Sequence, residues 1–313
     1  MKLFTAVDQV PAGFGPSVVS IGKFDGMHAG HRKVIAELRS VASARGLSAV
    51  AVTFDRHPLA LLRPELCPVA LLSNDQKLEL LAESGLDATL MLTFDLARSQ
   101  QLPEDFVSEV LVGALNSKVV LVGSDFRFGS KGAGDVALLR ELGAKHDFEV
   151  QLIDDVVAPA DGSARRASST WIRELLNEGK IAEATELLGR APSIRAMVVG
   201  GHQRGRTMGY PTANLSHDVE GFVPADGVYA ARIVIDGAKY GAAVSVGNNP
   251  TFEGVADKTV EAHVLDQHLD LYDKTVDLEF IEYIRPMNKF PDADALVKQM
   301  NADEVRIRSV LGL

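Results

Sequence analysis

The sequence predicts two domains of different classes: an α/β domain with a parallel sheet, followed by an antiparallel β domain that ends in a helix. Three observations support this prediction. The chain has 313 residues, more than one compact domain usually contains. Short apolar runs alternate with helix-period segments in its first half, whereas strand-like runs follow one another without helices in its second half. With 46% hydrophobic and 24% charged residues, the chain has enough apolar side chains for two cores.

The first half is expected to alternate strand and helix. Its expected strands span residues 18–21, 49–54, 89–94, 118–122 and 149–153. Its expected helices span residues 31–44, 103–114 and 135–145, and one more begins at residues 73–75. Nearly continuous apolar strands separated by helices are typical of a parallel sheet covered on both faces. Ligands of such sheets bind beyond the carboxyl ends of the strands.

The second half has a different pattern. Two expected helices, at residues 168–177 and 181–188, precede a short linker that contains Gly and Pro. Strand-like runs follow at residues 194–199, 227–235, 239–246, 259–265 and 275–284, and a helix at residues 292–311 closes the chain. Consecutive strands with turn residues between them suggest an antiparallel barrel or sandwich. We place the boundary so that residues 1–186 and 187–313 form the two domains.

Composition and charge exclude several classes of protein. The net charge of −10 argues against a general nucleic-acid-binding surface, which needs a basic face. No uncharged apolar run approaches the roughly 18 residues of a membrane helix, and Asp8 interrupts any signal-peptide pattern near the N-terminus. Cys67 is the only cysteine, which rules out an intrachain disulfide. We therefore expect a cytoplasmic protein without nucleic-acid or membrane partners; a homo-oligomer is also compatible with the sequence.

A glycine-rich turn between the first expected strand and helix contains two histidines. It reads G-K-F-D-G-M-H-A-G-H, and its histidines are His28 and His31. A histidine near a helix start is most often a surface or capping residue, and only Asp25 lies nearby as a third ligand for a shared metal. The alternative is phosphate binding, because glycines allow a ligand to approach closely and a helix start attracts anions. Imidazoles in such a turn can donate hydrogen bonds to phosphoryl oxygens.

The turn resembles a family signature. H-A-G-H matches the H-x-G-H motif of nucleotidyltransferases, and the longer string is similar to that of bacterial bifunctional riboflavin kinase/FAD synthetases, with Met27 in place of a valine. Three further strings follow in the order of that family: T-F-D-R-H-P from Thr53, with Arg56 in place of a proline, G-S-D-F-R-F-G from Gly123, and R-A-S-S-T-W-I-R from Arg166. Taken alone, the last string is at least as compatible with a helix N-cap followed by a surface arginine.

The resemblance implies that the first domain is a nucleotidyltransferase-like FMN adenylyltransferase. The phosphate of FMN would attack the α-phosphorus of ATP, pyrophosphate would leave, and Mg²⁺ would bridge the triphosphate. His28 and His31 would be catalytic, because they would stabilise charge on the phosphates. The implied nucleotide-binding residues are Gly22, Phe24, Gly30, Asp125, Arg166, Ser169, Thr170 and Arg173. The implied flavin-binding residues are Phe54, His57, Pro58 and Arg285.

A second string dense in glycine and basic residues, G-H-Q-R-G-R-T-M-G-Y-P-T-A-N, runs from Gly201 to Asn214. Composition alone favours a surface loop. P-T-A-N in this setting resembles the hallmark of riboflavin kinases, which implies an antiparallel β-barrel kinase domain that converts riboflavin to FMN with ATP. Gly201 and Arg206 would then contact ATP, while the Thr212 hydroxyl and the Asn214 carbonyl would be Mg²⁺ ligands. The chain has no Walker A motif, so it is not a P-loop kinase.

Two glutamates on expected strands compete for the role of general base in such a kinase. Strand alternation places Glu261 and His263 on one face, whereas Glu279 faces away from its apolar neighbours, as on a solvated surface. V-E-A-H, from Val260, resembles the family's V-E-T-H, whose glutamate is the proposed base. We assign the role to Glu261, which would accept the proton of the riboflavin 5′-hydroxyl. Asn288 stands where an acidic residue is common near the flavin, a departure from the family pattern.

Two alternatives remain open on sequence grounds. Another H-x-G-H enzyme, such as a class I aminoacyl-tRNA synthetase, is disfavoured by the acidic charge and by the lack of a K-M-S-K-S string. A non-enzymatic flavin- or nucleotide-sensing regulator with a degenerate site is disfavoured because the candidate functional residues are present, namely His28, His31, Thr212, Asn214 and Glu261. Product analysis after incubation with riboflavin, ATP and Mg²⁺ would separate the three.

Overall fold

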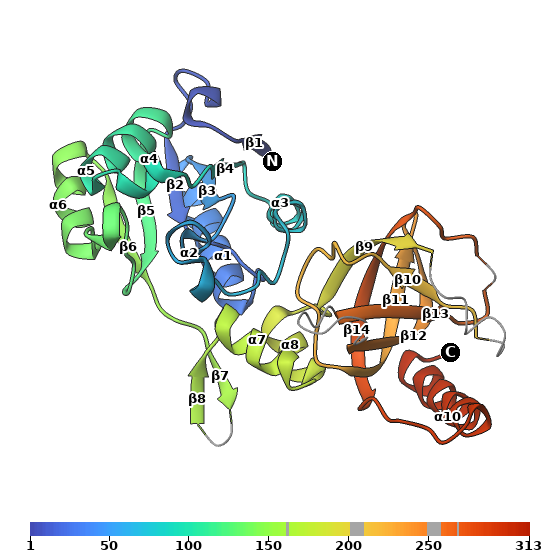
Figure 1. Ribbon diagram of the computed structural model, residues 1–313. Coiled ribbons are helices and arrows are strands. Elements are labelled where there is room, and N and C mark those ends of the chain that lie inside the picture. The colour runs from blue at the N-terminus through green and yellow to red at the C-terminus, as the bar shows by residue number, and fades with distance from the viewer. Residues whose placement is uncertain (161–162, 201–209, 249–257, 268) are drawn as a thin grey trace. The chain divides into compact units, whose positions relative to one another are not determined.

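The computed structural model describes residues 1–160, 163–200, 210–248, 258–267 and 269–313, and the chain forms two compact units (Figure 1). The first unit comprises Met1–Val69 and Asn74–Ser168, and the second comprises Ala70–Ser73 and Ser169–Leu313. Within the described part of the chain, no helix combines the length and the apolar composition that a bilayer crossing demands.

The first unit is built on a six-stranded sheet in the order β1-β4-β3-β2-β5-β6, in which every neighbouring pair is parallel. Its strands are β1 (Lys2–Phe4), β2 (Ser17–Ile21), β3 (Ser48–Phe54), β4 (Ala88–Leu92), β5 (Ser117–Gly123) and β6 (Glu149–Ile153). Val119, Val120 and Leu121 follow one another in β5 and are all fully buried. Because consecutive side chains of a strand point to opposite faces, both faces of the sheet are covered. The predicted parallel sheet is confirmed.

Helices connect the strands of this sheet. They are α1 (Ala29–Arg45), α2 (Pro58–Leu62), α3 (Asn74–Glu83), α4 (Leu96–Gln100), α5 (Pro103–Phe106) and α6 (Val136–His146), with a π-helix at Val107–Ala114 and 3₁₀ turns at Val7–Gln9, Pro64–Leu66 and Ser130–Gly132. α1 ends at Gly46, which adopts the left-handed conformation with φ of 65°. α6 follows Asp135, whose side chain accepts a hydrogen bond from the Leu138 N–H. A hairpin of β7 (Val157–Ala160) and β8 (Ser163–Arg166) completes the unit.

The order of the strands defines where a ligand can bind. β2 pairs with β3 on one side and with β5 on the other, so the direction of the chain across the sheet reverses at β2. In open α/β sheets, ligands bind at such a reversal, beyond the carboxyl ends of the strands. The glycine-rich turn that contains His28 and His31 connects β2 to α1 and therefore lies at this position.

The second unit is a closed barrel of antiparallel strands in the order β10-β13-β12-β11-β14-β9 (Figure 1). Its strands are β9 (Ser193–Val199), β10 (Ala213–Leu215), β11 (Gly227–Ile235), β12 (Ala238–Asn248), β13 (Lys258–Val264) and β14 (Thr275–Arg285). The terminal helix α10 (Ala293–Leu311) contacts β11, β12 and β14 and buries Ile307 and Leu311 in a shared apolar cluster. The expected barrel and its terminal helix are confirmed.

The structure differs from the sequence-based expectation in several elements. The helix expected at residues 103–114 is present, but it consists of one α-helical turn followed by a π-helix. The strands β1 and β10 were not predicted, because three residues are too few for a period to be recognised. The β7–β8 hairpin was missed because β7, V-A-P-A, contains a proline and β8, S-A-R-R, is polar.

Two helices that precede the barrel belong to the same unit as the barrel. They are α7 (Ser169–Asn177) and α8 (Ile181–Leu188). α8 contacts β14, its Leu187 and Leu188 are buried, and the Leu176 carbonyl at the end of α7 accepts a hydrogen bond of 2.9 Å from the Ala225 N–H. The compact unit thus begins before the boundary placed between residues 186 and 187. That residues 187–313 fold as a separate domain stays a prediction.

We expect a fragment of residues 169–313 to be more stable than a fragment of residues 187–313. The longer fragment keeps the apolar side chains of α7 and α8 buried, and each buried Leu or Ile contributes about 1.5–3 kcal/mol. Urea unfolding should therefore give a free energy of unfolding higher by about 3 kcal/mol or more for the longer fragment. Equal unfolding midpoints would show that these helices do not stabilise the barrel.

Candidate active sites

The turn between β2 and α1 is closely packed, and its backbone is strained. Phe24 and Met27 have positive φ angles of 50° and 46°, which residues other than glycine rarely adopt, yet both are buried at 1% and 4% exposure. A Cβ at Gly22 would lie 3.3 Å from the Phe24 ring, so this glycine lets the ring fold back onto the turn. Strain of this kind persists only where the surroundings enforce it, and it concentrates at functional sites.

His28 and His31 lie side by side at the end of this turn. Their rings are stacked, with centroids 3.8 Å apart and an interplanar angle of 25°. His28 precedes the first residue of α1, but its side chain does not cap the helix. A Cβ at Gly30 would lie 3.1 Å from His28 Cε1, tighter than side chains ordinarily tolerate. The position of the His28 ring therefore favours glycine at this place in the H-x-G-H string.

Both histidines are neutral near pH 7. Burial lowers the pKa of His28 to about 4, and the charges of Arg32 and Arg166 add to this shift. Burial likewise holds the pKa of His31 well below its usual value, with a further contribution from His28. Within the described residues, the buried Nδ1 atoms of both rings have no hydrogen-bond partner. Because buried polar atoms are nearly always satisfied, this pair of atoms indicates a ligand site.

Asp125 and Arg166, both expected to bind the nucleotide, form an ion pair close to the histidines. Asp125 follows β5 and Arg166 ends β8, and Arg166 Nη1 lies 2.6 Å from Asp125 Oδ2. Arg166 Nε lies 3.0 Å from Asp155 Oδ1. The hydrogen bond from Arg166 holds the pKa of the Asp125 carboxyl below its usual value. Three segments that are distant in sequence thus meet beyond the carboxyl ends of β2 and β5.

Three of the expected flavin-binding residues lie at the end of β3, in the loop after it and at the start of α2. His57 precedes α2, and its Nδ1 accepts a backbone N–H of that helix at 3.1 Å, while its Nε2 lies 3.0 Å from Lys23 Nζ in the β2–α1 turn. Pro58 is the first residue of α2. Phe54 ends β3, and its ring packs edge-on against Phe94 at a centroid distance of 5.6 Å. The structure therefore joins this loop to the glycine-rich turn.

Four other expected site residues lie in the second unit. Ser169, Thr170 and Arg173 are in the first turns of α7, and their contact with a nucleotide stays a prediction. Arg285, at the end of β14, forms a largely buried ion pair with Asp303 of α10, with Nη2 and Oδ2 2.8 Å apart. Sequence reasoning missed this pair, although an aspartate on an apolar helix face is a signal for a buried partner. Flavin contact by Arg285 likewise stays a prediction.

In the barrel, strand register places Asn214 beside Glu261. Asn214 of β10 is directly opposite Glu261 of β13, and Ser245 of β12 is opposite Glu261 on its other side. Directly opposed residues of antiparallel strands project from the same face. The residues on either side of Glu261 are buried inside the barrel, so this face is the outer one. His263 shares that face, as the alternation predicts.

Glu279 has a different environment from Glu261. Its two carboxylate oxygens accept hydrogen bonds from Lys239 Nζ at 2.7 and 2.9 Å. Lys239 comes from β12 and Glu279 from β14, so the pair spans the outside of the barrel over β11. A half-buried carboxylate held by an exposed lysine is consistent with the structural role predicted for Glu279.

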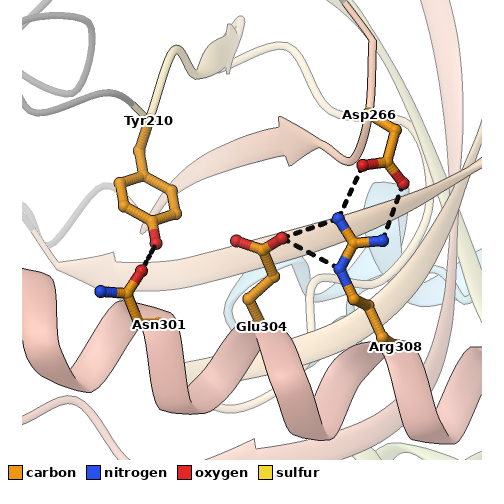
Figure 2. A network of polar contacts seen from close by, with 5 residues as sticks. All are labelled: Tyr210, Asp266, Asn301, Glu304 and Arg308. Carbon is orange, nitrogen blue, oxygen red and sulfur yellow. Dashed lines mark hydrogen bonds and ion pairs between the residues drawn. The ribbon is translucent and has the colours of Figure 1, made fainter.

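Side chains of α10 and β13 hold the segment that precedes Asn214, and Figure 2 shows the contact made by α10. The Tyr210 hydroxyl donates a hydrogen bond to the Asn301 side chain of α10. His263 Nδ1 lies 2.8 Å from the Pro211 carbonyl oxygen, and the His263 and Tyr210 rings contact each other at a centroid distance of 5.1 Å. Thr212 therefore lies between an anchored Pro211 and the paired strand β10. Sequence reasoning missed these contacts because they join residues distant in the chain.

Arg308 fixes α10 to the end of β13. Its two Nη atoms each lie 2.7 Å from an oxygen of Asp266, and its Nη2 and Nε also contact Glu304 at 2.7 and 3.0 Å (Figure 2). Bidentate pairing of this kind orients as well as attracts. The helix that supports Tyr210 is thus itself tied to the strand that contains Glu261.

The residues present fit a magnesium ion held mainly by a phosphorylated ligand. Within the described ranges, no group of three or more His, Cys, Asp or Glu side chains is arranged to bind a metal. Asn214 offers a hard oxygen atom opposite Glu261, and Thr212 offers another two residues earlier in the chain. Mg²⁺ characteristically takes few protein ligands together with phosphate oxygens. Gly201 and Arg206, the expected ATP contacts, lie outside the described residues.

The fold and these sites define a class of protein. A parallel α/β sheet with an H-x-G-H turn at its reversal point is a nucleotidyltransferase-like domain, and here it is joined to a six-stranded barrel with its own polar site. Comparison with known families identifies the family. The family model for FAD synthetase matches residues 12–170, and the family model for riboflavin kinase matches residues 188–311.

Relatives with the same two-domain name match almost the whole chain. A bifunctional riboflavin kinase/FMN adenylyltransferase of Listeria monocytogenes is 33% identical over 93% of this chain and 91% of its own. One from Escherichia coli (strain K12) is 34% identical over 95% of this chain and 93% of its own. The chain belongs to the family of bifunctional riboflavin kinase/FMN adenylyltransferases.

A solved structure extends the likeness to three dimensions. The crystal structure of a protein from Streptococcus pneumoniae, described as a macrolide-efflux protein, matches with a TM-score of 0.86 and 32% identity, covering 98% of both chains. Both family models and the sequence relatives match enzymes of flavin metabolism, and none of them is described as an efflux protein.

We expect the neutral histidines to make the first unit less stable in acid. An unfolded histidine has a pKa of 6.5, above the value of about 4 that His28 has in the fold. The unfolded state therefore binds more protons, and the contribution to stability is complete above about pH 6.5 and decreases until about pH 4. Between about pH 7 and pH 5, His28 alone should account for a loss of about 1–2 kcal/mol.

Urea unfolding at the two pH values measures this loss. Circular dichroism follows both units, whereas fluorescence of Trp171, the single tryptophan, follows the second unit and serves as the internal control. His28→Gln should lose less stability between the two pH values than the parent protein does. An identical pH dependence for both would contradict a buried, neutral His28.

Proposed function

We propose that each unit of the chain performs one of the two reactions of its family. The chain is a riboflavin kinase and an FMN adenylyltransferase: it phosphorylates riboflavin to FMN with ATP, and it then transfers an adenylyl group from ATP to FMN to form FAD. One observation supports the assignment of one reaction to each unit. The stacked histidines lie in the segment that matches FAD synthetase, and Asn214 opposite Glu261 lies in the segment that matches riboflavin kinase.

In the first unit, His28 and His31 act as hydrogen-bond donors to the phosphates. Charge builds on the phosphate oxygens as the FMN phosphate attacks the α-phosphorus of ATP and pyrophosphate leaves. A neutral imidazole donates through one ring nitrogen, and the strained turn holds both rings in place before the reaction begins. The nucleophile is already an anion, so no general base and no covalent intermediate is required.

In the second unit, Glu261 accepts the proton of the riboflavin 5′-hydroxyl as that oxygen attacks the γ-phosphorus of ATP. Thr212 and Asn214 would hold Mg²⁺, which neutralises charge on the phosphates of ATP. Asn214 is suited to this role because it lies directly opposite Glu261, so the base and the metal ligand share one face. The contact between His263 and the Pro211 carbonyl fixes the segment that contains Thr212.

The partners of the chain follow from its activity. Riboflavin, FMN and ATP are its substrates, and FAD is its final product. Incubation with riboflavin, ATP and Mg²⁺, followed by chromatography of the flavins, should yield FMN first and FAD later. A protein that binds flavin but forms neither product would support the regulator alternative. A cytoplasmic location, the absence of nucleic-acid and membrane partners, and the homo-oligomer stay predictions.

His28→Ala should slow the conversion of FMN to FAD by about 10²-fold or more, because a fixed donor to the developing charge is lost. The rate of FMN formation from riboflavin, measured on the same preparation, should not change. FAD formation at the parent rate would contradict the catalytic role of His28.

Glu261→Gln should lower turnover of riboflavin to FMN by about 10²–10⁴-fold, the usual contribution of a general base. Glu279→Gln is the matched control, since it changes the same group on the same barrel but removes only the ion pair with Lys239. Its turnover should remain within about threefold of the parent, as expected for an exposed ion pair. A larger loss at Glu279 than at Glu261 would reverse the assignment of the base.

A further inference from the structure

A buried lysine lies behind the loop that follows β3. Lys77, in α3, is 7% exposed, although burying an ammonium group is costly unless it is paired. Its Nζ donates hydrogen bonds to the Phe54 carbonyl oxygen at 2.8 Å and to Asn74 Oδ1 at 3.0 Å. The adenylyl-transfer chemistry described for the two histidines does not use this residue.

Two carboxylates from different loops interact electrostatically with this charge. Burial lowers the pKa of Lys77, and the carboxylates of Asp25 and Asp55 act in the opposite direction. Asp25 belongs to the glycine-rich turn after β2, and Asp55 directly follows Phe54 at the end of β3. The ammonium group is therefore coupled to both of the loops in which the first site is built.

Asn74 extends the contact along the same stretch of backbone. Its Nδ2 donates to the Asp55 carbonyl oxygen at 2.7 Å, so the first turn of α3 binds two consecutive carbonyl groups beyond the sheet. The Asp55 side chain in turn accepts the Phe94 N–H at 2.9 Å. These contacts hold the backbone at the end of β3, within the T-F-D-R-H-P string, in addition to the hydrogen bonds between the strands.

We propose that Lys77 is a positioning residue for adenylyl transfer: it holds the Phe54 carbonyl, so that the loop after β3 presents the flavin to the glycine-rich turn. The proposal rests on the function assigned to the first unit above, because that loop contains the expected flavin contacts. Lys77 acts through the backbone and touches no substrate. It therefore affects the affinity for FMN more than the affinity for ATP.

Lys77→Met tests the proposal, because methionine has a similar length but no donor and no charge. The KM for FMN should rise by about tenfold or more, while the KM for ATP should change by less than about twofold. Phosphorylation of riboflavin by the same molecules takes place in the second unit and should keep its rate. Lys118→Met is the matched control: it removes an exposed lysine of the same unit, paired with Asp147 at 2.8 Å, and should leave both KM values unchanged.

Asn74→Ala is a second variant that releases the same loop without removing a buried charge, and it decides the matter if Lys77→Met does not fold. It should also raise the KM for FMN, and the two substitutions together should have less than their summed effect, because both act on one loop. An unchanged KM for FMN in both variants, or an equal rise in both KM values with a lowered melting temperature, would overturn the positioning role. A parent protein that forms no FAD from FMN would instead refute the function assigned to the first unit.

Discussion

The parallel pairing of β2 with β3 on one side and β5 on the other determines where the first site forms. Val19 of β2 is in register with Val50 and with Val120, so the three strands end at neighbouring levels of the sheet. The segments that follow them contribute His28, the T-F-D-R-H-P string and Asp125, which are far apart in the sequence. The contacts of Arg166 with Asp125 and of Lys23 with His57 then join these loops to one another. Any change in strand register would separate the groups on which the chemistry depends.

The barrel reaches the same result with antiparallel strands. Glu261 is placed by its two cross-strand neighbours, Asn214 and Ser245, rather than by a loop. β10 has only three residues, so its ladder cannot by itself orient the segment before it. The contacts of Tyr210 with Asn301 and of His263 with Pro211 supply the missing constraint. The terminal helix is therefore part of the support of the site and not only a cover for apolar strands.

Sequence reasoning predicted the elements that have a clear hydrophobic period, and it failed where local pattern carries no information. The long strands of the first unit are continuous apolar runs, and those of the barrel and α1 have a period, whereas β1 and β10 are too short to show either pattern. The H-x-G-H and P-T-A-N strings identified His28 and Asn214, because the residues of each motif are adjacent in the sequence. Lys77 has no such signal, because a lysine within a helix is ordinarily a surface residue. Its role depends on where β3 ends, which only the packing of α3 determines.

The electrostatics of the first site explain why its geometry has to be so rigid. The protein is acidic overall, with a net charge of −10, yet its substrates are themselves anions. Two rings stacked 3.8 Å apart cannot both be charged without strong repulsion, so the site offers neutral donors instead of a ready positive field. The nearby Arg166 is already paired with Asp125 and Asp155. The charges of Arg32 and Arg166 act on the same place, whereas the neutral histidines contribute through the directions in which they donate hydrogen bonds.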